Sequence, residues 1–142
     1  MKEINIMVVD SQGGGLGKQL VSAIKKEYPK AHILAVGTNV LATSAMIKAG
    51  ADEAATGENP IVVVSKKADI IIGPVGMVIA DSMLGEITPR MAAAIAQAPA
   101  RRIMIPFNSC DNYIAGVANF GTGRLIEDAM QKLKEYFQDM DC

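Results

Sequence analysis

The sequence predicts a three-layer α/β fold, in which a doubly wound, mainly parallel sheet of strand order 3-2-1-4-5 is covered by helices on both faces. Short apolar runs alternate along the chain with segments whose apolar residues recur at helical spacing. Glycine-rich segments directly follow two of those runs, at residues 12–17 and 73–76. The 142 residues are 50% hydrophobic and contain no repeat or linker, so we expect one domain over residues 1–142.

The first strand is predicted at residues 6–9 and is followed by a glycine-rich turn and a helix. Leu16, Leu20, Val21 and Ile24 follow at helical spacing, and Pro29 ends the helix because proline cannot continue the hydrogen-bond ladder. The second strand covers residues 33–36. Asn39 then caps a helix that ends at Gly50. We expect its inward residues to be Leu41, Ala42, Ala45, Met46 and Ala49.

A short third strand near residues 52–55 precedes an ambiguous segment, residues 61–64. Four β-branched or apolar residues favour a strand there. Pro60 suits the first turn of a helix, however, and Lys66 and Lys67 suit a helix C-terminus. A helix is also needed as the crossover between parallel strands, so we predict a helix.

The second half of the chain repeats the alternation. Residues 69–73 form the fourth strand, and residues 77–84 read as a short helix closed by Gly85. Thr88 and Pro89 open the next helix, with Met91, Ala92, Ile95 and Ala98 on one face. A fifth strand at 102–107, a polar turn at 108–112, a possible sixth strand at 113–117 and a loop at 119–123 follow. The last helix starts near Arg124, with an inward face of Leu125, Ile126, Ala129, Met130, Leu133 and Phe137.

The glycine-rich turn after the first strand predicts a binding site for a phosphate or carboxylate group. Glycines allow bare N–H groups to face a ligand, and the following helix directs its positive end to the same place. The turn matches neither the dinucleotide pattern G-x-G-x-x-G nor the Walker pattern fully, and a tight turn that binds nothing is the alternative. In the strand order above, residues 12–17 and 73–76 flank the topological switch point, where ligands bind. The candidate ligand-binding residues are Asp10, Gln12, Gly13, Gly14, Gly15, Gly17, Lys18, Thr38, Asn39, Gly73, Pro74, Gly76 and Asn108.

Several of these residues also have a purely structural interpretation. Thr38 or Asn39 could bond a ribose, although capping of the next helix explains them as well. Asp10 could bind the amides of the turn instead of a ligand. Lys18 opposes the helix dipole in the first helical turn, which favours a role in binding a phosphate.

Candidates for catalysis are few. Cys110, Asp81 and Glu86 are the weak candidates, the two carboxylates as general bases. His32 precedes the second strand, at the opposite end of the sheet from Cys110, so a Cys-His pair is not expected. No tyrosine has a lysine four residues later, as a short-chain dehydrogenase would need. One histidine and two separated cysteines argue against a zinc site, so we expect no metal.

The cofactor is undetermined, and a nucleotide is possible. NAD is disfavoured, because dinucleotide-binding proteins place an acidic residue after the second strand and this chain has Gly37, Thr38 and Asn39 there. A net charge of −1 without a basic cluster argues against nucleic acid. The absence of a long apolar run argues against a membrane span, and the N-terminus lacks a signal-peptide pattern, so we expect a cytoplasmic protein.

The chain also resembles a family of small bacterial proteins of unknown function with a Rossmann-like fold. The resemblance rests on residues 12–18, Gly37-Thr38-Asn39 with Ala42-Thr43, 49–52, 55–59, 73–76, 82–89 and 105–110, and the run Ser-Met-Leu-Gly-Glu-Ile-Thr-Pro is specific to it. Ser11 stands where the family tends to have glycine, and Asp81 where it tends to have asparagine. The resemblance implies the fold and no reaction.

Two functions from different classes follow from these residues. The first is binding of a small anionic ligand, a nucleotide or another phosphorylated or carboxylate compound, through the glycine-rich turn. The alternative is an enzyme, or an enzyme subunit, acting on such a ligand between the loops after strands 1 and 4. Half of the residues are hydrophobic, nine are methionine, and few charges lie between Ile70 and Leu84, which together also predict self-association, most simply as a dimer.

Overall fold

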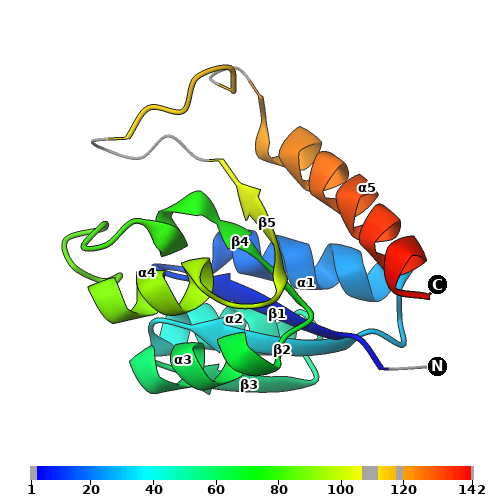
Figure 1. The fold of residues 1–142 in the computed structure, drawn as a ribbon, viewed down its shortest axis with the longest axis horizontal. Helices are drawn as coiled ribbons and strands as arrows, with labels where there is room; N and C mark the ends of the chain where they lie inside the picture. Colours follow the sequence, from blue (N-terminus) through cyan, green and yellow to red (C-terminus); the bar gives the residue numbers. More distant parts are fainter. Residues whose placement is uncertain (1–2, 107–111, 118–119, 142) are drawn as a thin grey trace.

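The computed structural model describes residues 3–106, 112–117 and 120–141 and has the predicted architecture (Figure 1). Its five strands form one sheet of order β3-β2-β1-β4-β5, and every neighbouring pair is parallel. The strands are β1 (Asn5–Asp10), β2 (His32–Gly37), β3 (Glu53–Thr56), β4 (Ile70–Pro74) and β5 (Arg101–Ile105). The sheet is therefore a Rossmann-like one with its switch point between β1 and β4.

Helices cover both faces of this sheet. They are α1 (Gly15–Glu27), α2 (Val40–Lys48), α3 (Glu58–Lys67), α4 (Pro89–Ala96) and α5 (Thr122–Asp141), with a short 3-10 helix η1 (Val75–Val78) after β4. Alternate residues of β1, β2 and β4 enter two separate cores. Ile6, Val8, Ile70 and Ile72 pack with α1, α2 and α5. Met7, Val9, Ile71 and their neighbours pack with α3, η1 and α4.

The residues predicted to cap helices make the expected hydrogen bonds. Asn39 accepts a hydrogen bond from the Ala42 N–H (2.9 Å), and Thr88 caps α4 at Met91 (3.1 Å). The ambiguous segment 61–64 is helical: it lies in α3, which carries Glu58 in its first turn and two lysines in its last. These charges complement the helix dipole and outweigh the β propensity of the valines.

Three sequence-based expectations are wrong. Leu41 does not point inward but is 73% exposed, because α2 contacts the sheet through Ala42, Thr43 and Met46 instead. Residues 77–84 are not a helix: η1 ends at Val78, and turns follow in which Asp81, Met83 and Leu84 all have positive φ. Residues 113–117 are not a sixth strand, since the chain turns at Ala115-Gly116, with φ +89° at Gly116.

The carboxyl ends of the strands and the two chain termini lie at opposite ends of the molecule (Figure 1). The loops that follow β1, β2 and β4 therefore meet at one edge of the sheet, far from the termini. In the described part of the chain, no helix combines the length and apolar character that crossing a bilayer requires.

Candidate functional site

The candidate site lies at the carboxyl end of β1, where the glycine-rich turn leads into α1. Asp10, the last residue of β1, is only 5% exposed. Its two carboxylate oxygens accept from the Ser11 N–H (2.8 Å) and the Gly17 N–H (2.6 Å), so the side chain fastens the turn to the strand. Burial raises the pKa of Asp10 above its ordinary value. The two amide hydrogen bonds act in the opposite direction, and the charge of Glu86 raises the pKa further.

The glycines of the turn divide into two kinds. Gly14 and Gly17 are required by packing: Gly14 has φ +75° and lies against the backbone of Ala42, and a Cβ at Gly17 would come within 3.0 Å of Met46 and Asp10. Gly13 and Gly15 are different, because a Cβ at either would have no neighbour within 4 Å. The fold as described does not need glycine at 13 and 15, so these two positions need another explanation.

The backbone amides at the start of α1 also fall into two groups, those with a hydrogen-bond acceptor and those without one. A helix begins with four N–H groups that have no acceptor within the helix. Here the Gly14 N–H donates to the Ser11 carbonyl (3.1 Å) and the Gly17 N–H to Asp10. The N–H groups of Gly15 and Leu16 have no acceptor among the described residues, and α1 has neither a side-chain cap nor an acidic residue in its first turn. Two free donors therefore lie at the positive end of the helix, next to the open glycines.

Glu86 joins three loops at this edge. Its Oε2 accepts from the Gln12 N–H (2.6 Å) and from the Thr38 hydroxyl (2.7 Å), with Asn39 Nδ2 at 3.5 Å. Asn39 Nδ2 also donates to the Gln12 carbonyl (2.8 Å). The structure thus brings together Gln12, Thr38, Asn39 and Glu86, which are far apart in the sequence. The sequence has no acidic residue directly after β2, but the fold places the Glu86 carboxylate there.

The remaining predicted residues lie as follows. Lys18 is exposed on the first turn of α1, and Asp81 is exposed in the loop after η1. Gly73 and Pro74 belong to β4 itself, where a Cβ at Gly73 would clash with the Val9 backbone. Gly76 lies in the short 3-10 helix η1, so the turn at residues 73–76 is not followed by the helix predicted at residues 77–84. Asn108 and Cys110 lie outside the described residues.

Sequence reasoning missed Ser11, Met83 and a cavity at the far edge of the sheet. The Ser11 hydroxyl, 3.1 Å from Met83 Sδ, ties the first loop to the loop after η1.

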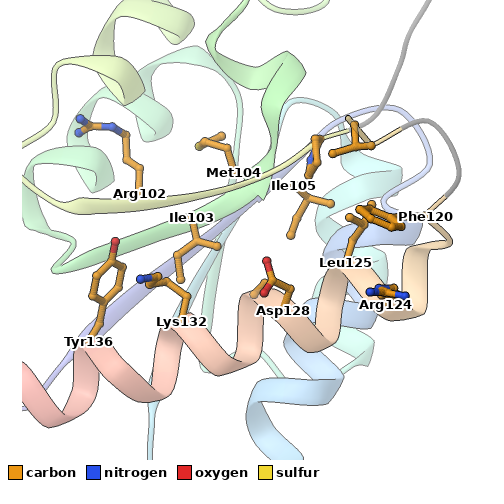
Figure 2. A pocket seen from close by; sticks show the side chains of 13 residues that line it. Arg102, Ile103, Met104, Ile105, Phe120, Arg124, Leu125, Asp128, Lys132 and Tyr136 are labelled. Atoms are coloured by element: carbon orange, nitrogen blue, oxygen red, sulfur yellow. The ribbon is translucent and has the colours of Figure 1, made fainter. Parts of the chain in front are cut away.

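The cavity, of about 500 Å³, lies between β5 and α5 (Figure 2). Ile103 and Ile105 point toward α5, while Arg102 and Met104 point to the other side of the strand (Figure 2). This cavity and two others, of about 280 and 540 Å³, contain no residue of the glycine-rich turn.

The three cationic side chains around the β5–α5 cavity make contacts within the protein. The Arg102 guanidinium donates to the carbonyls of Ala98 (2.6 Å) and Ala100 (3.1 Å). Arg124 lies over the Phe120 ring, 4.7 Å from its centroid, and Lys132 pairs with Glu135 (3.4 Å). The described residues contain no group of three or more His, Cys, Asp or Glu side chains that could hold a metal ion. The glycine-rich turn therefore remains the best candidate.

Similar solved structures share little sequence with this chain. A dodecameric FMN-dependent UbiX-like decarboxylase from Escherichia coli O157:H7 is 16% identical, with a TM-score of 0.46, over 93% of this chain and 75% of that one. AibC is 19% identical, with a TM-score of 0.48, over 89% and 35%. The quinone oxidoreductase of Thermus thermophilus is 18% identical, with a TM-score of 0.44, over 91% and 44%. Similarity at this level says nothing about ligand or reaction.

Among curated proteins, the comparison found no match. One family matches nearly the whole chain, over residues 5–138: it is described as "Domain of unknown function (DUF3842)". The protein belongs to this family.

Proposed function

We propose that this protein binds a small anionic ligand, a nucleotide or another phosphorylated or carboxylate compound, at the start of α1. The observation that carries the proposal is the coincidence of two free amides, of Gly15 and Leu16 within the described residues, with two glycines that the fold does not need. Amides at a helix N-terminus bind phosphate and carboxylate groups through hydrogen bonds and the helix dipole. A side chain at position 13 or 15 would stand between such a ligand and those donors.

Lys18 supports the same function. Its ammonium group lies on the exposed side of the first turn, where it opposes the helix dipole and has no ion-pair partner among the described residues. A bound anion would turn this unfavourable position into a favourable one. The buried Asp10 does not replace the ligand, because its two oxygens are both used on Ser11 and Gly17.

Binding without chemistry is better supported than the alternative, an enzyme or enzyme subunit acting on the same ligand. Of the candidate catalytic groups within the described residues, Glu86 is hydrogen-bonded to other loops, and Asp81 is exposed to solvent. The enzyme alternative would gain support if a bound ligand were chemically converted to a product during incubation with the protein.

The experiment is a thermal-shift screen of inorganic phosphate, nucleotides, sugar phosphates and dicarboxylates on the wild type, Gly15→Val and Lys18→Ala. We expect at least one anion to stabilise the wild type. Gly15→Val should abolish the shift by blocking the amides. Lys18→Ala should weaken binding by about 1–2 kcal/mol, the contribution of one charge-assisted contact.

Matched controls separate blocked binding from damage to the helix. Gly123 also lies in the first turn of a helix, and a Cβ there also has no neighbour within 4 Å, so Gly123→Val should respond to the anion like the wild type. Lys26→Ala removes an exposed lysine from the other end of α1 and should leave the shift unchanged. If no anion stabilises the wild type, or if Gly15→Val responds as Gly123→Val does, the glycines form only a tight turn.

A further inference from the structure

The loop formed by residues 79–87 lies beside the glycine-rich turn and places its own carboxylate on two donors there, one from the turn and one from the end of β2. Glu86 Oε2 takes the Gln12 N–H from the glycine-rich turn and the Thr38 hydroxyl from the end of β2. A main-chain amide of a glycine-rich turn and a hydroxyl after β2 are the kinds of group that hold an anionic or hydroxylated ligand in this fold. The protein thus uses one of its own acids where a ligand would be expected.

The 79–87 loop has two parts, a base at which its two ends are hydrogen-bonded to each other and a tip formed by residues 81–86. At the base, the Asp81 N–H donates to the Ile87 carbonyl (2.7 Å) and the Ile87 N–H to the Ser82 carbonyl (3.3 Å). Ile87 is fully buried, whereas Leu84 at the tip is fully exposed. Among the side-chain contacts that join the tip to the rest of the molecule are the bonds of Glu86, the contact of Met83 with Ser11, and the Ser82 hydroxyl on the Gly76 carbonyl (3.0 Å).

The backbone of the tip is strained. Asp81, Met83 and Leu84 have φ of +63°, +56° and +56°, a region that places the Cβ of a non-glycine residue too close to a carbonyl oxygen. Such residues persist only where surrounding contacts hold them, and they are common in segments that switch between two states. Here the contacts of Met83 and Glu86 that hold the tip from outside are made to the candidate site.

We propose that the 79–87 loop is an autoinhibitory strap, whose Glu86 must leave the Gln12 and Thr38 donors before an anion binds at the start of α1. This inference rests on the proposed function and adds its regulation. The charge of Glu86 acts on the same place, because it raises the pKa of Asp10, which binds the Gly17 N–H in the first turn of α1, and would repel an anion there as well.

The test compares the affinity for inorganic phosphate of the wild type, Glu86→Gln and the control Glu58→Gln. Glu58 is also half-buried and accepts from a threonine hydroxyl, that of Thr88 (2.7 Å), but it lies at the start of α3 and pairs with Arg90 rather than with the glycine-rich turn. A strap that is closed nine-tenths of the time raises the apparent Kd about tenfold. We therefore expect Glu86→Gln to bind phosphate about tenfold more tightly than the wild type. Glu58→Gln should bind like the wild type.

Hydrogen exchange of residues 79–87 gives a second readout that needs no ligand. We expect faster exchange of this loop in Glu86→Gln than in the wild type or Glu58→Gln, and faster exchange in the wild type on addition of phosphate. Equal phosphate affinity and equal exchange in wild type and Glu86→Gln would overturn the strap while leaving the proposed function intact. Weaker binding in Glu86→Gln would also overturn it, since Glu86 would then hold the ligand.

The same measurements identify a failure of the proposed function. If phosphate binds to neither the wild type nor Glu86→Gln, and no other anion in the thermal-shift screen binds, there is no anion site for the strap to control, and both proposals are refuted. If another anion binds the wild type, it replaces phosphate as the probe, and the expected tenfold difference applies to it.

Discussion

Replacement of Gly17 by alanine should destabilise the protein far more than the same change at Gly15, although both glycines lie in the first turn of α1. A methyl group at Gly17 would lie 2.6 Å from Met46 Sδ, 2.9 Å from Asp10 Cβ and 3.0 Å from Asp10 Oδ2. The methionine can turn aside, because its side chain is flexible. Asp10 cannot, because both of its carboxylate oxygens are bonded to the turn.

The magnitude follows from three contributions. Overpacking of a buried site costs about 1–3 kcal/mol. Loss of the hydrogen bond from the Gly17 N–H to the Asp10 carboxylate costs about 1.5–3 kcal/mol more, since one partner is charged. The higher helix propensity of alanine offsets about 1 kcal/mol of this loss of stability. We expect the free energy of unfolding of Gly17→Ala to fall by about 1.5–5 kcal/mol.

Urea unfolding followed by far-UV circular dichroism measures this difference, provided that the slope m is the same for all variants. The control is Gly15→Ala, where a Cβ meets no atom within 4 Å and φ is not in the left-handed region. Its stability should stay within about 0.5 kcal/mol of the wild type or rise by up to about 1 kcal/mol. Equal losses in the two variants would refute the division of the glycines into packing and open positions.

Two further predictions concern Asp10 and α2. Burial raises the pKa of Asp10, so the stability linked to this carboxyl is full below its ordinary pKa of 3.8 and is lost as the pH rises through the folded-state pKa. The free energy of unfolding measured against pH should therefore fall more steeply across that window in the wild type than in Asp10→Asn, and parallel curves would contradict this. α2 exposes Val40 (69%), Leu41 (73%) and Ile47 (52%) on its surface, so we expect a dimer through this helix. Light scattering should give twice the monomer mass of 15.0 kDa, and Leu41→Asp should give the monomer, whereas a monomeric wild type would exclude the dimer.

The strand order could be predicted from the sequence because it depends on few, strong signals. Alternation of short apolar runs with helical segments leaves a parallel sheet as the main solution, and right-handed crossovers restrict its order. Helix α3 could be predicted despite its valines, since Pro60 and the terminal charges of the helix indicate the same structure. These signals are local or topological, and each is readable along a single stretch of chain.

The orientation of α2 could not be predicted by the same means. Its apolar residues are spaced for a face that includes Leu41, but Gly14 and Gly37 allow the helix to approach the β1 and β2 loops closely, at Ala42 and Thr43. The helix is thus rotated so that small residues face inward and Leu41 faces solvent. Gly14 and Gly37 permit this rotation of α2, but the sequence does not show that these two glycines contact α2, because that depends on which segments meet in space.

The 79–87 loop does not follow its sequence pattern for a related reason. The sequence predicts a helix at residues 77–84, and nothing in a side chain such as that of Met83 or Leu84 indicates a left-handed backbone. Among the three non-glycine residues with positive φ in this loop, Asp81 is the one whose type is informative, since aspartate and asparagine tolerate this conformation better than most. Backbone strain of this kind depends on contacts made elsewhere, here those of Glu86.

The position of Glu86 also changes the argument about the ligand. The sequence disfavours NAD because no acidic residue follows β2, but that argument considers only the residues next to Thr38 along the chain. In space, Glu86 Oε2 lies 2.7 Å from the Thr38 hydroxyl, so the site does contain a carboxylate at the end of β2. The carboxylate can act there as an internal competitor or as an acceptor for ligand hydroxyls, and these two roles predict opposite signs for Glu86→Gln. Tighter binding of a simple anion identifies the competitor; weaker binding of a ribose-containing nucleotide, with phosphate unaffected, would identify the acceptor and restore NAD as a candidate.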